Sequence, residues 1–315
     1  MLSRVANSLF WIARYVERAE NTARIIDVTF NLNLLPSLRK QSSELWYPAL
    51  EITGMHETYP DDLKTSKDLN FIAYMVFDQT NPSSIFSSIK MARDNALQVR
   101  SSLSTETWQT INNFWIELNN LKPNQVLKSS VLEFCEWIKN ESHLFRGSVL
   151  STLLRDDAYL FLRLGTSIER SDNTARLLDV KYHLLLPKYE KVGGALDYYE
   201  WNSILRSVSA LEAYQKIYKE GITPWSVVEL LILNPDMPRS LMMCYNDILS
   251  LLQSLTRWKK KSALGHINQK IKYLHQMNIS KIYKKGLHEF LTDFIDENIH
   301  LSNLIHDDFM SNQIR

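Results

Sequence analysis

The chain has 315 residues, of which 45% are hydrophobic and 23% are charged, and its formal net charge is +1. This composition is ordinary for a folded protein, and the near-neutral net charge of the whole chain gives no indication of which partners it binds. The two cysteines form no CxxC pair, which argues against a disulfide framework and favours a reducing, cytoplasmic location. No run of about 18 apolar residues is present, so we expect no membrane span.

Apolar residues recur at helical spacing in almost every window, and 8 glycines and 9 prolines are too few for a turn-rich β fold. In the first part of the chain the pattern predicts helices over residues 3–35, 43–59, 67–77, 82–103, 105–121 and 124–140. The fourth of these is predicted to begin with Asn81 as the capping acceptor and Pro82 as the first helical residue. Further helices are predicted over residues 156–186, 196–219, 224–233 and 236–257.

One polar string occurs twice. VERAENTARIIDV begins at Val16 and IERSDNTARLLDV begins at Ile168, and eight of the thirteen positions are identical. Other markers keep nearly the same spacing of about 152 residues, which predicts an internal duplication; they are Pro36 and Pro187, Trp46 and Trp201, and Asn81-Pro82 and Asn234-Pro235.

The duplication predicts an all-α, internally duplicated helical bundle. We expect one domain over residues 1–315 that contains repeats 1–150 and 151–315, related by a pseudo-two-fold axis. Two separate bundles are the alternative arrangement. No Gly/Ser/Pro-rich linker lies between the halves, and its absence favours the fused domain.

On a helical wheel, the polar residues of each string gather on one face. Within that face, Glu20 and Arg24 stand four apart, a spacing that gives intrahelical pairs worth roughly 0.2–0.5 kcal/mol each. A solvated face would explain one copy, but it has no use for the same Asn and Thr twice, since both are mediocre helix formers. The repetition therefore leaves two interpretations open. One is a buried polar network, and the other is a ligand cleft in which Arg binds carboxylate or phosphoryl groups.

These residues also carry a family resemblance. FWIARYVERAENTARIIDV and FLRLGTSIERSDNTARLLDV resemble the signature of the alpha-E domain family, a helical family named for its Glu-Arg motif. The resemblance covers nearly the whole chain, including NPSSIFSSIKMARDNALQVRSSLSTETWQTIN at residues 81–112. Members are typically encoded beside a circularly permuted ATP-grasp ligase and a transglutaminase-like cysteine peptidase. The resemblance thus implies a role in amide-forming peptide modification or synthesis, with these two proteins as partners.

The resemblance also implies a set of ligand-binding or polar-network positions. Two positions depart from the family pattern. Thr166 of the second copy stands where the pattern usually has Arg, and Ala96-Leu97 of the first half stands where Ala-Arg is common. The second copy is therefore expected to lack one anion contact. The implied positions are Arg14, Glu17, Arg18, Asn21, Arg24, Asp27, Arg93, Arg100, Glu169, Arg170, Asn173, Arg176 and Asp179.

Other sequence features narrow the function. No Gly-rich phosphate loop, HExxH motif or Cys/His cluster is present, so we expect no cofactor and no metal. From Arg257 to His288 there are nine Lys or Arg residues and no Asp or Glu. We interpret this basic stretch as a solvated helix face, with an acidic protein partner as the functional alternative. Nucleic acid is disfavoured, because no recognition motif is present.

Three hypotheses for function follow. The leading one is an accessory or substrate-binding subunit that works with the ATP-grasp ligase and holds a peptide or amino-acid substrate in a polar cleft between the two Glu-Arg helices. In the second, the chain is itself an acyl- or amino-group transferase with Glu17 or Glu169 as the base. In the third, the strings form a buried Arg/Glu/Asp network in a structural scaffold.

Overall fold

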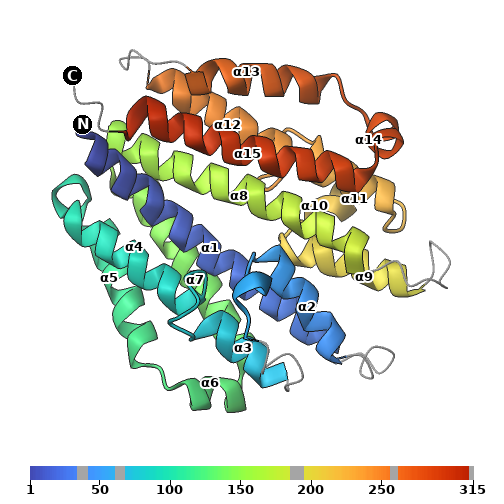
Figure 1. Cartoon of the computed structure of the whole chain (residues 1–315), viewed down its shortest axis with the longest axis horizontal. Coiled ribbons are helices and arrows are strands. Elements are labelled where there is room, and N and C mark those ends of the chain that lie inside the picture. Colours follow the sequence, from blue (N-terminus) through green and yellow to red (C-terminus); the bar gives the residue numbers. More distant parts are fainter. Residues whose placement is uncertain (34–41, 61–67, 185–194, 256–261, 312–315) are drawn as a thin grey trace. The chain divides into compact units, whose positions relative to one another are not determined.

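The computed structural model describes residues 1–33, 42–60, 68–184, 195–255 and 262–311, and every regular element in these ranges is a helix (Figure 1). This confirms the predicted all-α class, whereas the internal repeats and their pseudo-two-fold axis remain predictions. The chain divides into two compact units, residues 1–169 with 309–315 and residues 170–308. The division falls inside one helix, α8 (Asp157–Leu184), between the Glu and the Arg of the second string.

The first unit is built around the long helix α1 (Ser3–Asn33), which packs against α4 (Ile85–Gln98) and α7 (Val131–Thr152). Helix α5 (Thr105–Asn120) packs against both α4 and α7. Apolar residues of α1 such as Leu9, Ile12 and Ile26 are completely buried, as an amphipathic central helix requires. The remaining elements of this unit are α2 (Ser42–Ile52), η2 (His56–Thr58), α3 (Asp68–Val76), η4 (Arg100–Ser102), α6 (Pro123–Ser129) and the start of α8.

The second unit continues from α8 through α9 (Ala195–Ser207), α10 (Leu211–Ile217), α11 (Pro224–Ile232) and α12 (Leu241–Ser254). It ends with α13 (Ser262–His275), α14 (Ile279–Lys285) and α15 (Leu287–Phe309). Helix α12 packs along α13, and α11 contacts α9, α12 and α14. The core of this unit includes the fully buried Ile248, Ile267 and Leu291.

The helix predicted to begin at residue 82 begins later, which corrects the assignment of its cap. The Asn81 side-chain oxygen accepts a hydrogen bond from the Ser83 backbone N–H, so Asn81 forms a turn instead of a cap. Ser84 is the N-cap, and its hydroxyl oxygen accepts from the Ser87 backbone N–H. The second Asn-Pro pair precedes α12 in the same way, with Ser240 as the cap.

Two predicted helices are in fact pairs of helices. The region 124–140 divides at Ser130, which ends α6 and caps α7, and α7 then continues to residue 152. The region 196–219 divides between α9 and α10, where Ser209 has a φ of 52°. A left-handed residue cannot continue a right-handed helix. Neither break carries the Pro or Gly that usually signals one in a sequence.

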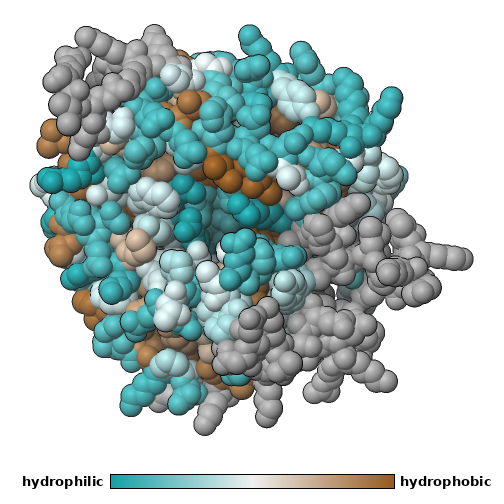
Figure 2. All heavy atoms as spheres, in the orientation of Figure 1, coloured by the Kyte–Doolittle hydropathy of each residue, from teal (hydrophilic) through white to brown (hydrophobic). Residues whose placement is uncertain are grey.

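The described helices present polar side chains to solvent. Hydrophilic residues predominate on the face shown in Figure 2, with the apolar ones in small groups. Within the described ranges, no helix combines the length and the apolar character that crossing a membrane requires. The predicted helix stops at Pro36 and Pro187, and the start of the basic stretch up to residue 261, lie outside the described residues.

Helices α1 and α8 approach each other very closely within the first unit. A Cβ atom added at Gly165 of α8 would lie 2.2 Å from the backbone oxygen of Phe10 on α1. This contact distance therefore admits only glycine. Residues four apart share a helix face. Arg14 therefore lies one turn after Phe10 on the same face of α1, and Glu169 lies one turn after Gly165 on the same face of α8. The crossing at Gly165 thereby positions Arg14 beside Glu169.

We expect Gly165→Ala to lower the free energy of unfolding by about 3 kcal/mol, because the added methyl must push α1 and α8 apart. Gly147→Ala on α7 is the matched control, since a Cβ there meets no atom within 4 Å. The control should be neutral or up to about 1 kcal/mol more stable. Urea denaturation followed by circular dichroism measures both, and equal stability of the two variants would contradict a tight crossing.

Candidate functional site

Glu169 is held by two arginines inside the first unit. Arg14 donates from Nε to Oε2 at 2.7 Å, and Arg18 donates from Nε to Oε1 at 2.6 Å and from Nη2 to Oε2 at 3.2 Å. Arg18 thus grips the carboxylate with two nitrogens, the geometry that makes Arg–carboxylate pairs strong. The arginines also lie over aromatic rings, Arg14 over Trp11 at 4.6 Å and Arg18 over Tyr15 at 5.7 Å. We call Arg14, Arg18 and Glu169 the Glu169 cluster.

The Glu169 cluster controls the protonation state of its carboxylate. Glu169 is 3% exposed, and its burial acts to raise the pKa, but the charges and hydrogen bonds of Arg18 and Arg14 outweigh burial and hold the pKa at about 2. The carboxylate therefore stays ionised throughout the physiological range. A group held this firmly in its charged form is a poor proton acceptor near pH 7.

A second set of ion pairs joins α1 to α7. Arg146 of α7 donates to Glu17 at 2.9 Å and contacts Glu20 as well. Glu20 also accepts from Arg24 Nε at 2.8 Å, and His143 Nε2 lies 3.6 Å from the same oxygen. Glu17 and Glu20 are 1% and 0% exposed. We call Glu17, Glu20, Arg24 and Arg146 the Arg146 cluster.

The ion pairs continue toward the C-terminal end of α1. Lys139 of α7 lies 3.0 Å from Asp27 and 2.6 Å from Glu136. Partial burial disfavours the Lys139 ammonium, but these two carboxylates more than compensate and raise its pKa. The polar face of α1 is therefore ion-paired along about four helical turns, with Glu17, Glu20 and Arg24 buried and with Arg14, Arg18 and Asp27 half-buried. The solvated-face interpretation is wrong for this copy.

The second string forms smaller pairs within the second unit. Arg176 lies 2.7 Å from Asp172, the predicted four-residue pair, and the two side chains are 31% and 15% exposed. Asp179 contacts His288 Nδ1 of α15 at 2.6 Å. Ser171 donates to Asn298 at 3.0 Å. Each string carries five charged residues, but those of the second string that lie in the second unit are more exposed than Glu17, Glu20 and Arg24 of the first.

The remaining predicted positions fall in several environments. Asn21 is buried, whereas Arg170 and Asn173 are half-buried. Arg93 contacts Asn112 of α5 at 3.4 Å and Asp94 of its own helix at 3.3 Å, while Arg100 lies over the Trp108 ring. In the described structure both arginines therefore contact α5 and their own segment instead of the carboxylates of α1.

Thr166, which replaces the expected second arginine, is buried. Its hydroxyl donates to the Leu162 backbone oxygen at 3.2 Å within α8. Cys135 is also buried, and burial raises the pKa of its thiol, so it remains a protonated core residue. In the described ranges no three or more His, Cys, Asp or Glu side chains come together in a way that fits a metal ion.

Sequence reasoning missed the side chains of α7 that face the carboxylates of α1. Lys139, His143 and Arg146 follow one another at spacings of four and three residues, so they share one face of the helix. This basic stripe faces an acidic stripe that includes Glu17, Glu20 and Asp27. Matching the two stripes was the one available signal, because α7 carries no copy of the repeated string.

The lowered pKa of Glu169 predicts how the free energy of unfolding depends on pH. The pKa of Glu169 falls from 4.5 to about 2 on folding, so its contribution to stability is complete above pH 4.5 and is lost as the pH falls toward 2. We expect the wild type to lose on the order of 3 kcal/mol more than Glu169→Gln over this range. Parallel stability curves for the two proteins in urea titrations at several pH values would contradict this assignment.

Comparisons with known proteins bear on these residues. A family model described as a predicted alpha-helical domain with a conserved ER motif matches residues 1–310. No curated protein matches the chain, and no solved structure matches it either. Glu-Arg pairs occur in both strings, at Glu17-Arg18 and Glu169-Arg170. Three of these four residues belong to the ion-paired clusters of the first unit.

Proposed function

The chain belongs to the alpha-E family, and we propose that it is a non-catalytic binding subunit of an amide-forming system, in which an ATP-grasp ligase performs the chemistry. The family resemblance supplies the partners, an ATP-grasp ligase and a transglutaminase-like protein, and the substrate class, a peptide or amino acid. One observation supports binding over catalysis: arginines engage the buried carboxylates of the first unit.

The transferase alternative needs Glu17 or Glu169 as a base. A general base is most effective when its pKa lies near the working pH. The pKa of Glu169 is held at about 2, and the carboxylate of Glu17 accepts directly from Arg146. These contacts favour ion pairs that organise the helices over carboxylates that exchange protons.

The cationic ends of the network are not fully enclosed. The side chains of Arg18 and Arg146 are 25% and 19% exposed, in contrast to the 4% and 0% of Glu169 and Glu17. The accessible part of each cluster is therefore its positive part. A guanidinium fixed by a buried carboxylate is preorganised to contact the carboxylate of a peptide or an acidic surface of the ligase.

Reconstitution with an ATP-grasp ligase and a transglutaminase-like protein from the same genome tests this proposal. We expect the chain and the ligase to elute as one complex in size-exclusion chromatography with light scattering. ADP release and amide formation should require the ligase and should increase when the chain is added. Turnover by the isolated chain would overturn the non-catalytic role, and a lack of both complex and stimulation would overturn the partnership.

A substitution separates binding from support of the fold. Arg18→Lys keeps the positive charge but removes the two-nitrogen grip, so we expect stimulation of the ligase to fall about tenfold with a melting temperature close to that of the wild type. Arg155→Lys, an exposed arginine of the same unit, is the matched control. If Arg18→Lys stimulated the ligase as fully as the wild type does, the two clusters would serve only to support the fold.

A further inference from the structure

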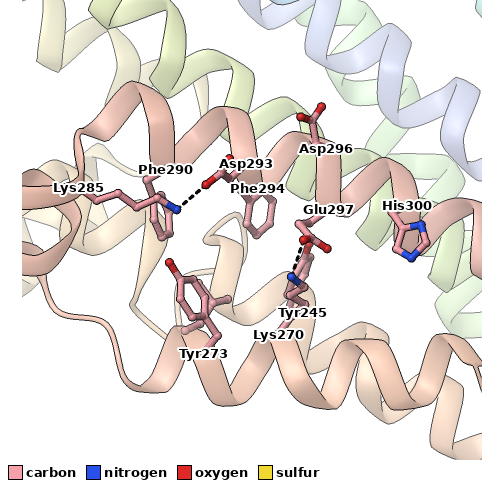
Figure 3. Close-up of a pocket in the computed structure, with 11 residues that line it drawn as sticks. Tyr245, Lys270, Tyr273, Lys285, Phe290, Asp293, Phe294, Asp296, Glu297 and His300 are labelled. Atoms are coloured by element: carbon pink, nitrogen blue, oxygen red, sulfur yellow. Dashed lines mark hydrogen bonds and ion pairs between the residues drawn. The ribbon is translucent and has the colours of Figure 1, made fainter.

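The second unit contains a cavity that neither repeated string predicts (Figure 3). Its volume is about 630 Å³, within the range of small-molecule sites. Side chains of α12, α13, α14 and α15 line it. In the described part of the chain this lining includes four Tyr or Phe rings, three carboxylates and two lysines. The wall is therefore aromatic, with charges of both signs at defined places.

One end of the cavity already holds an ammonium group. Lys285 Nζ lies 6.0 Å from the centre of the Tyr273 ring, 5.9 Å from the centre of the Phe290 ring and 2.5 Å from Asp293 Oδ2. Lys285 donates a hydrogen bond to Asp293, and this bond raises the pKa of the Lys285 ammonium. Ring faces together with a carboxylate form the usual surroundings of a bound organic cation. Figure 3 shows Lys285, Asp293 and Tyr273 pointing toward one another at this end.

The charges of the lining also favour a cation over an anion. Lys270 is paired with Glu297 at 2.6 Å and Lys285 with Asp293, so each lysine already has a carboxylate partner, and the lining contains one carboxylate more than it contains lysines. Asp296 is the additional carboxylate, and Figure 3 shows it pointing away from both lysines. His266 adjoins Glu297 at 3.1 Å, and burial lowers its pKa, so it adds no positive charge at neutral pH.

A buried tyrosine forms part of the cavity wall. Tyr245 lines the cavity, is 1% exposed and stacks on Phe294 with ring centres 4.7 Å apart. Its hydroxyl has no hydrogen-bond partner among the residues that the structure describes. Buried polar atoms of this kind are rare without a partner. The Tyr245 oxygen is itself closed off from the space of the cavity, so this residue contributes its ring to the aromatic wall.

We propose that this cavity binds a small organic cation with a primary ammonium group, which takes the place of the Lys285 ammonium between Tyr273, Phe290 and Asp293. The Lys285 side chain is 37% exposed, so it can turn into solvent when the ligand enters. Lys285 then acts as an internal competitor that keeps the aromatic end ordered in the absence of ligand. This site does not depend on the ligase partnership proposed above.

Calorimetric titration of the full chain with 1,5-diaminopentane at neutral pH and low salt tests the proposal. We expect a dissociation constant of about 1 mM or below. Asp293→Asn should weaken binding about tenfold, and Lys285→Met should strengthen it about tenfold, because one removes the attracting charge and the other removes the competitor. Asp236→Asn, at an exposed position before α12, is the matched control and should bind as the wild type does.

Hexanoate, an anion with a chain of similar length, is the opposing probe. Binding of hexanoate in preference to the diamine, or weaker diamine binding by Lys285→Met, would overturn the proposal. So would a lack of diamine binding by both the wild type and Lys285→Met up to about 10 mM. Should Asp293→Asn fail to fold in circular dichroism, Phe290→Leu replaces it, with a several-fold loss expected from the missing ring face.

Discussion

Glu169→Gln is expected to lower the free energy of unfolding at pH 7 by about 3–5 kcal/mol, the largest single effect we anticipate. The substitution keeps the size and shape of the side chain. It removes the negative charge that Arg14 and Arg18 contact at 2.7 and 2.6 Å, so both guanidinium groups lose the carboxylate that they share at the crossing of α1 and α8. Chemical denaturation gives the free energy directly, and a fall of roughly 10 °C in Tm should accompany it.

Two further variants show whether the loss comes from unpaired charge. Asp172→Asn removes the carboxylate of the half-exposed pair with Arg176 and should lower stability by about 1 kcal/mol or less. Arg14→Met combined with Arg18→Met and Glu169→Gln should recover part of the loss, because the two positive charges that faced the Glu169 carboxylate are removed as well. A loss no larger for Glu169→Gln than for Asp172→Asn would show that solvent reaches the Glu169 cluster.

Helical periodicity located most of the fold, and its failures have a common cause. The helix predicted over residues 105–121 is observed as Thr105–Asn120, and Pro224 begins α11 as its fixed φ predicts. The breaks at Ser130 and Ser209 were missed. Serine is compatible with both helix and turn, and tertiary packing selects the turn at these positions. Two Asn-Pro pairs marked the right regions but not the first helical residues.

The repeated string identified most of the residues of the first unit's network, and its interpretation as a buried polar network is confirmed there, but it did not identify the side chains of α7 that complete the network. A helical wheel shows which residues share a face, but it does not show what packs against that face. The repeated Asn and Thr argued against a solvated face, and the burial of Thr22 and Thr174 agrees with that argument. Arg146, the cation that contacts two of the buried carboxylates, lies 129 residues from Glu17, beyond any local pattern.

The cavity of the second unit was beyond sequence reasoning for the same reason. Its lysines belong to the basic stretch that we interpreted as a solvated face or an acidic partner's surface. In the structure, Lys270 and Lys285 are paired with Glu297 and Asp293 of α15. Two lysines of the basic stretch therefore form ion pairs with carboxylates of α15 in the same chain, and the packing of the helices brings these residues together.

Arg146→Met is the second variant with a large expected effect. The methionine fills much of the arginine volume but removes the cation that contacts both Glu17 and Glu20, which are 1% and 0% exposed. We expect the free energy of unfolding to fall by about 3–4 kcal/mol at pH 7. Arg155→Met, at an exposed position of the same unit, should change it by about 0.5 kcal/mol or less.

The pH dependence of Arg146→Met distinguishes a buried charge from lost packing. A buried carboxylate deprived of its cation has a folded-state pKa above its unfolded value, so it favours the folded state increasingly as the pH falls. Lowering the pH from about 7 to 5 should therefore recover part of the stability of Arg146→Met while leaving Arg155→Met unchanged. Combining Arg146→Met with Glu17→Gln and Glu20→Gln should abolish that recovery, since both titrating groups are gone. A recovery that persists in the triple variant would assign the pH response to groups other than these two carboxylates.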